Sequence, residues 1–167
     1  AKSALKSGAF SIQLDTPSAG QLYSMDMAWQ IDESKITISD KSAKIAAIYF
    51  ALVQSGEQKN LFLGSYAYTP SGVSATVATY VYCNKSLSIK GMETFDNEAI
   101  IFDVKFNKGW NVMLAKVNST LEETPVTSMS YTSVASTSGL VLIWTIIDLE
   151  AYGVALPSKI MSSKFFK

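Results

Sequence analysis

The chemistry open to this 167-residue chain is limited by two residue types that it lacks. The sequence contains no histidine and no arginine, so all 14 of its basic residues are lysines. Without histidine, no serine or cysteine nucleophile has the usual general base, and the commonest transition-metal ligand is missing. Ser3 and Lys6 match the S-x-x-K spacing of a serine–lysine dyad, but this pattern is too short to be specific. We therefore expect no enzymatic activity.

Close pairs of carboxylates are the remaining route to acid–base catalysis or calcium binding. Glycoside hydrolysis needs two carboxyl groups that flank one bond, and calcium needs several oxygen ligands. No D-x-D-x-D loop is present, and the available acids fall at expected strand ends, where solvated carboxylates are common. We expect neither a metal nor a cofactor. The pairs are Asp26 with Asp32, Asp96 with Glu98 (with Asn97 between them), and Asp148 with Glu150.

The single cysteine, Cys83, offers no disulfide or zinc chemistry. One cysteine cannot form an internal disulfide or half of a C-x-x-C motif. No histidine or arginine is present to lower its pKa, so a reactive thiolate is disfavoured. We predict a small apolar residue near the end of a strand.

Charge argues against nucleic acid as a partner. The 14 lysines are balanced by 14 acidic residues, so no basic stripe is available to displace counterions. Without arginine there is no planar guanidinium group to form bidentate hydrogen bonds with phosphate or guanine. The longest apolar run, residues 140–147, is far shorter than the ~20 residues of a membrane helix. We expect no nucleic-acid binding and no membrane span.

Aromatic residues are the one positive functional signal. Trp29 and Trp144 lie within apolar patterns and are predicted to be core residues. Trp110 follows a tight turn and is predicted to close the end of a hairpin. Tyrosines two positions apart share one face of a strand, and an exposed aromatic face can stack on a sugar ring. The candidate platform consists of Trp110, Tyr66, Tyr68, Tyr80 and Tyr82.

Alternating apolar and polar residues predict the strands that position these side chains. Nine or ten short strands separated by turn residues are typical of an all-β protein, and we expect a two-sheet antiparallel β-sandwich, immunoglobulin-like or transthyretin-like. A single domain over residues 1–167 is expected, with the first few residues frayed. Nine strands are expected at residues 10–14, 25–31, 36–38, 61–68, 73–82 with its continuation at 87–89, 100–106, 110–114, 126–134 and 140–147, and residues 160–166 are the candidate for a tenth strand at an edge.

The segment from Ala43 to Gln54 fits two structures. Its apolar residues fit one face of a helix capped by Asp40 and stopped by Gly56. Its β-branched and aromatic residues instead favour a strand buried on both faces. We predict a strand.

Two turns are predicted from their chemistry. Pro70-Ser71-Gly72 should reverse the chain, because proline presets one dihedral angle and glycine tolerates positive φ. Asn107-Lys108-Gly109 should join the flanking strands in the best hairpin of the sequence, with Gly109 in a left-handed conformation. The continuous apolar run 140–147 is predicted to be a central strand.

Two stretches resemble a group of small secreted lipoproteins of unknown function from Bacteroidetes. They are residues 80–91, which begin Tyr-Val-Tyr, and residues 106–112, which contain Lys-Gly-Trp-Asn. This chain departs from the group at Asn84, Ser86 and Phe106-Asn107. The resemblance implies a β-sandwich at the cell envelope, outer membrane-associated or periplasmic, with a lipid anchor on a cysteine upstream of Ala1. It implies no catalytic residues.

Two functions follow as hypotheses. The first is a non-enzymatic cell-envelope or secreted protein that contacts a protein or matrix partner through a sheet edge or face. The alternative is a glycan-binding module that uses the aromatic platform. A surface rich in serine, threonine and lysine, with one cysteine, suits an extracytoplasmic protein.

Overall fold

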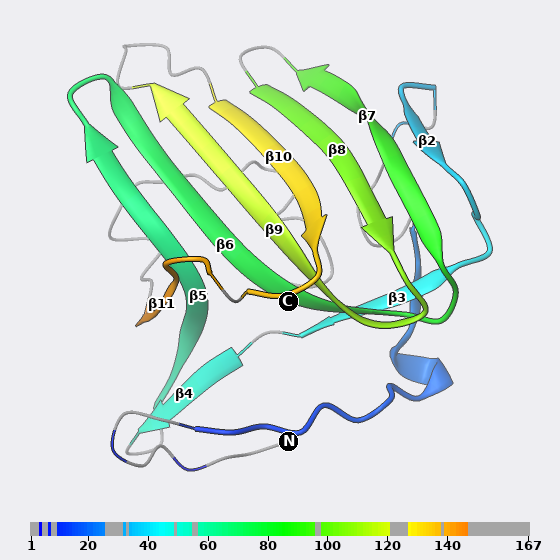
Figure 1. Ribbon diagram of the computed structural model, residues 1–167, viewed down its shortest axis with the longest axis horizontal. Helices are drawn as coiled ribbons and strands as arrows, with labels where there is room; N and C mark the ends of the chain where they lie inside the picture. Colours follow the sequence, from blue (N-terminus) through cyan, green and yellow to red (C-terminus); the bar gives the residue numbers. More distant parts are fainter. Residues whose placement is uncertain are drawn as a thin grey trace.

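A computed structural model describes residues 4, 7, 10–25, 32, 34–48, 50–54, 57–95, 98–120, 127–137 and 139–146. In this part of the chain eleven strands form one sheet, which curls across the molecule (Figure 1). A short 3-10 turn, η1 (Ala19–Gln21), precedes the first strand. The strands are β1 (Tyr23–Ser24), β2 (Ile36–Ile38), β3 (Lys44–Ile48), β4 (Phe50–Gln54), β5 (Glu57–Thr69), β6 (Gly72–Cys83), β7 (Leu87–Phe95), β8 (Glu98–Phe106), β9 (Gly109–Thr120), β10 (Thr127–Val134) and β11 (Ile143–Ile146).

The sheet is mixed, and its main path runs β1-β3-β6-β9-β10-β8-β7-β2. Neighbouring strands on this path are antiparallel except β8 and β10, which are parallel. The all-β prediction is confirmed. The two-sheet antiparallel sandwich is not confirmed, because β6 pairs with β9 along its whole length and joins the strands on both sides into one continuous sheet.

One side of β6 pairs with β9, and the other side pairs with two different strands, so the sheet branches at β6. β5 pairs with residues 72–78 of β6, and β3 pairs with residues 80–83. After β3 the chain leaves β6, and β4 pairs with the first half of β5 instead. The preference for strand over helix between Ala43 and Gln54 is therefore confirmed. The turn at Pro70-Ser71 is also confirmed, since Thr69 pairs with Gly72 across it.

One face of the sheet, here called the core face, carries the main hydrophobic core. Alternation along β8 is regular: Ile100, Phe102, Val104 and Phe106 are buried, and the residues between them are exposed. Strand register places these side chains beside buried residues of β7 and β10, and buried residues of β6 belong to the same core. Burial of this apolar surface is the main free-energy gain of the fold. The core residues include Met25, Ile36, Ile45, Val81, Cys83, Leu87, Ile89, Met113, Met129 and Tyr131.

Gly91 lets β2 approach β7 closely. It pairs with Ile36 and has φ +142°, a conformation that residues with a side chain rarely adopt. A Cβ atom at this position would lie 2.3 Å from the backbone oxygen of Lys35. The glycine that interrupts the apolar alternation is thus the residue of β7 against which the backbone of β2 packs most closely among the described glycine contacts of this strand pair.

The predicted hairpin at Asn107-Lys108-Gly109 is only partly right. Gly109 has φ +103°, so the left-handed glycine is confirmed. The two strands do not form a ladder with each other in the described part of the chain, because β10 lies between them and pairs with both. β8 and β9 therefore diverge from the turn (Figure 1). The local sequence predicts the turn, but β10, which follows later in the chain, pairs with the two strands that the turn connects.

Two further strand predictions differ from the structure. Residues 10–14 keep the expected alternation, with Phe10, Ile12 and Leu14 half-buried, but they belong to no strand. The run 140–147 is not central: of its described residues, 140–146, only 143–146 form a strand, and this strand pairs with β5 alone among the described strands. Val141 is 87% exposed. Apolar composition alone does not distinguish a central strand from an edge strand.

Several predicted features lie outside the described residues. These include most of the expected strand at 25–31 with Trp29, and the expected strand at 160–166. Among the predicted carboxylate pairs, Asp26, Asp96, Asp148 and Glu150 lie outside the described residues. The same is true of Asn97 in the calcium site that was considered. Ser3 and Lys6 are also outside. Within the described ranges, no helix is long and apolar enough to cross a membrane.

Candidate binding surface

The face of the sheet opposite the core, here called the open face, carries small hydroxyl side chains. Register aligns Thr76 of β6, Lys116 of β9 and Ser130 of β10 in one row across the sheet. Ser74 donates a hydrogen bond to Asn118 Oδ1 across two strands, at 2.9 Å. The open face comprises Ser74, Thr76, Lys90, Met92, Ile101, Asp103, Lys105, Lys116, Asn118, Ser128, Ser130 and Thr132.

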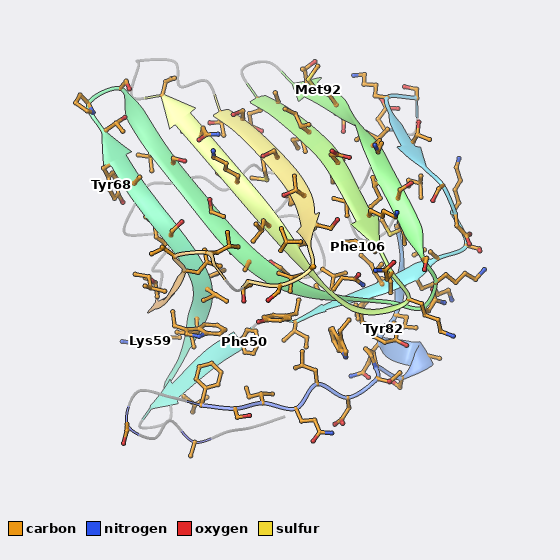
Figure 2. All side chains as sticks on the ribbon, in the orientation of Figure 1. Phe50, Lys59, Tyr68, Tyr82, Met92 and Phe106 are labelled. Atoms are coloured by element: carbon orange, nitrogen blue, oxygen red, sulfur yellow. The ribbon has the colours of Figure 1, made fainter. Side chains whose placement is uncertain are left out.

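Two apolar side chains interrupt the open face. Ile101 continues the row from Ser130, and Met92 lies opposite Ile101 on β7. Ile101 is 39% exposed although both of its neighbours in β8 are buried, and Met92 is 54% exposed beside the buried Glu93. Single exposed apolar residues are ordinary, but two that pair across strands form a patch. Met92 lies at the far end of β7, at the opposite corner of the sheet from Lys59 (Figure 2).

Charges around this apolar pair are mostly positive. Lys90, Lys105 and Lys116 are exposed on the open face, and Asp103 is the single acidic residue among its described members. Lys90 Nζ lies 3.4 Å from Asp103 Oδ1, and both side chains are 70% exposed. An exposed pair of this kind adds little stability. The open face therefore presents an excess of positive charge that an acidic partner would neutralise.

A cluster of aromatic rings occupies the other end of the same face, where β3, β4, β5 and β6 meet. Phe50 is its centre, with ring centroids 4.9 Å from Trp144 and 6.0 Å from Tyr80, both edge-on. Phe10 closes over them, 5.1 Å from Trp144. These rings fill the branch point of the sheet and pack against one another. Trp144 is nevertheless 37% exposed, so the prediction that it is a core residue is wrong, and the cluster is a half-buried aromatic contact outside the main core.

Trp110 and Tyr82 form a separate pair beside the aromatic cluster. They are cross-strand neighbours in β9 and β6, with centroids 5.4 Å apart and an interplanar angle of 70°. Edge-to-face packing of this kind stabilises a sheet. Trp110 Nε1 is buried and has no hydrogen-bond partner. The pair does not present two coplanar ring faces.

The five predicted platform residues are divided between the two faces of the sheet. Tyr80, Tyr82 and Trp110 lie on the open-face side, whereas Tyr66 and Tyr68 of β5 lie on the core-face side. Tyr68 is 66% exposed, and Tyr66 is half-buried. Burial, with a smaller contribution from Tyr68, raises the pKa of Tyr66. No single flat platform contains all five rings.

Cys83 is the last residue of β6 and is fully buried, as its sequence context predicts. Burial raises the pKa of its thiol from 9.0 to about 12. The thiolate fraction at neutral pH is therefore negligible, and the thiol is unsuited to nucleophilic chemistry.

Comparison with known proteins identifies no family or function for this surface. No protein-family model, curated protein or solved structure matches this chain. The resemblance to Bacteroidetes lipoproteins stays a prediction. Function must be argued from the surface itself.

The exposed apolar pair is the part of this surface that sequence reasoning missed. Its signal is visible in the sequence: Ile101 shares a strand face with Asp103 and Lys105, so an apolar residue stands at an outward-facing position. Its partner Met92 could not be matched to it without the register of β7 against β8.

Proposed function

We propose that this protein is a non-enzymatic, extracytoplasmic binding module that docks an acidic protein segment on its open face. The observation that carries the proposal is the exposed pair Met92 and Ile101, surrounded by hydroxyl side chains and lysines. Interfaces concentrate their binding energy in a few apolar anchors, and a polar rim excludes water around them. Here Ile101 and Met92 are the anchor.

The charge of the rim selects the partner. Lys116 lies in the same row as Ile101, with only Ser130 of β10 between them, and Lys105 lies farther along β8. A partner with one apolar side chain flanked by aspartates or glutamates would cover the anchor and neutralise these lysines. The location outside the cytoplasm is supported by composition alone: a surface rich in serine and threonine, lysine as the only basic residue type, and one cysteine.

A peptide selection tests the proposal. Random 12-residue peptides displayed on phage are selected on the immobilised protein and counter-selected on a variant that combines Ile101→Ala, Lys105→Glu and Lys116→Glu. Surviving peptides are synthesised, and their dissociation constants are measured by fluorescence anisotropy. We expect acidic peptides whose affinity falls about tenfold with Ile101→Ala alone.

The matched control is Lys59→Glu, because Lys59 is exposed but lies on β5 at the opposite corner of the sheet from Met92 (Figure 2). It should change affinity less than about twofold, a difference of ~0.4 kcal/mol. Selected peptides that bind the triple variant as tightly as the parent would overturn the proposal. Loss of peptide binding with Lys59→Glu would overturn it as well.

The glycan-binding alternative retains one specific observation, the location of Tyr80, Tyr82 and Trp110 on one side of the sheet. Its rings are half-buried and packed edge to face with neighbouring rings, so they do not lie as one flat surface under a sugar. An array of neutral and sulfated oligosaccharides distinguishes the two functions. Glycan binding that is lost with Trp110→Phe but unaffected by Ile101→Ala would favour the alternative.

A further inference from the structure

The outer edge of β5 is only partly covered. Gly64 pairs with Val77 of β6 and with Ile143 of β11, so β6 and β11 flank β5 on opposite sides. β11 begins at Ile143, opposite Gly64. Beyond this point, residues 65–69 pair with β6 on one side and, in the described part of the chain, with no strand on the other (Figure 1).

This free edge lacks the features that usually protect an edge strand. Exposed edges are normally shortened, charged or interrupted by proline to prevent pairing with another chain. Residues 65–69 read Ser-Tyr-Ala-Tyr-Thr and contain no charge and no proline. The opposite end of the sheet differs: β2 is only three residues long and follows Lys35.

We propose that β5 pairs antiparallel with β5 of a second copy of this chain, with Ala67 on the two-fold axis. A symmetric antiparallel pair keeps each face of the sheet continuous, so it must bring a residue opposite its own copy. Centring the pair on Ala67 uses all five free residues. Centring it on Tyr66 would bring Tyr68 opposite Gly64, which already pairs with β11.

The side chains of this register complement one another. Ser65 lies opposite Thr69 of the second copy, and Tyr66 lies opposite Tyr68, with every pair occurring twice. Cross-strand aromatic pairs and hydroxyl pairs both stabilise antiparallel sheets. Tyr68, 66% exposed in the single chain, would gain a partner ring. The smallest side chain, Ala67, occupies the centre, where the two copies approach most closely.

Electrostatics do not oppose this association. The chain has a formal net charge of zero, so two copies do not repel each other at long range. The exposed apolar residue Ile143 flanks the same edge, opposite Gly64 of β5. Because only five residues of each copy pair, we expect a weak dimer with a dissociation constant on the order of 10–100 µM.

Sedimentation velocity of the whole chain between 5 and 500 µM tests the dimer, with charge complementation as the decisive step. Ala67 is exposed, so Lys or Glu at this position is compatible with the fold. Ala67→Lys and Ala67→Glu should each sediment as monomers, because like charges would meet on the axis. An equimolar mixture of the two should restore the dimer. Ala135→Lys, at an exposed alanine just after β10, is the matched control and should dimerise like the parent.

The outcomes separate cleanly. A parent protein that stays monomeric at 500 µM overturns the proposal, and so does an Ala67→Lys protein that still dimerises. Failure of the mixture to dimerise overturns the register. As a measurement that needs no charge, Ala67→Cys should cross-link to its own copy with a short bis-maleimide, whereas Ala135→Cys should not. Equal cross-linking of the two cysteine variants overturns the proposal.

Discussion

The side-chain amide of Asn111 holds both backbone groups of Asn107. Asn111 Oδ1 accepts a hydrogen bond from the Asn107 N–H at 2.9 Å, and Asn111 Nδ2 donates to the Asn107 carbonyl at 2.8 Å. Nδ2 also lies 2.9 Å from the carbonyl oxygen of Gly109. The amide thus replaces a strand partner at the point where β8 and β9 diverge and β10 has not yet entered between them.

This arrangement predicts that Asn111→Asp destabilises the protein. The carboxylate keeps the acceptor for the Asn107 N–H but places negative charge against two carbonyl oxygens, which then lose their donor. We expect a loss of about 1–3 kcal/mol in the free energy of unfolding. Urea titration followed by far-UV circular dichroism measures it.

Asn118→Asp is the matched control, because Asn118 lies on the same strand and its side chain only accepts a bond from Ser74 at the surface. It should shift stability by less than ~0.5 kcal/mol. Equal losses of stability from the two substitutions would show that the hydrogen bonds of Asn111 to Asn107 do not stabilise the point where β8 and β9 diverge.

Backbone conformation predicts the cost of replacing Gly109. Its φ is +103°, and no atom lies within 4 Å of the position that a Cβ atom would take, so the cost of Gly109→Ala comes from the backbone rather than from a clash. We expect about 1–3 kcal/mol, and Gly109→Val should fall in the same range or above it. Gly20→Ala is the control, since it also has free space but no positive φ. Thermal melts of both variants measure the difference, and equal melting temperatures would contradict the strain.

Substitutions of Trp110 test whether its ring contact with Tyr82 stabilises the fold. Trp110 is half-buried, so Trp110→Ala should cost about 2–3 kcal/mol, below the ~3–5 kcal/mol of a fully buried ring. Trp110→Phe should cost less, because it keeps a ring and removes the buried Nε1–H that has no partner. Chemical denaturation measures both. A Trp110→Ala protein that unfolds at the parent's denaturant concentration would instead favour the ligand-binding role of this residue.

Cys83 predicts a loss of stability at alkaline pH. Its pKa is 9.0 when exposed and about 12 in the folded chain, so above pH 9 the unfolded state releases a proton that the folded state retains. Stability attributable to Cys83 is complete below pH 9 and falls by about 1.4 kcal/mol per pH unit between pH 9 and 12.

The difference between the parent and Cys83→Ala isolates this effect, because the tyrosines titrate equally in both proteins. The unfolding free energy of the parent minus that of Cys83→Ala should be smaller at pH 10.5 than at pH 8. A constant difference across this range would contradict the raised pKa. The native thiol should also react with Ellman's reagent far more slowly than the thiol in urea.

Local chemistry determined much of this protein from the sequence alone. Alternation identified the strands at residues 36–38, 73–82, 87–89 and 100–106, because burial of one sheet face imposes a period of two. The turn at Pro70-Ser71 and the left-handed Gly109 followed from backbone restrictions that act within a few residues. The prediction of Cys83 as a small apolar residue near a strand end agrees with its place as the last, fully buried residue of β6.

Tertiary structure decided how the strands pair and which side chains share a surface. Insertion of β10 between β8 and β9 depends on a contact between segments distant in the chain, which no local pattern encodes. The same is true of the branch of β6 into β5 and β3, which gathers Phe10, Phe50 and Trp144. Spacing placed Tyr66 with Tyr68 and Tyr80 with Tyr82, but only the antiparallel register of β5 and β6 put the two pairs on opposite faces. Because cross-strand neighbours depend on register, the pairing of Met92 with Ile101 became visible only in the folded sheet.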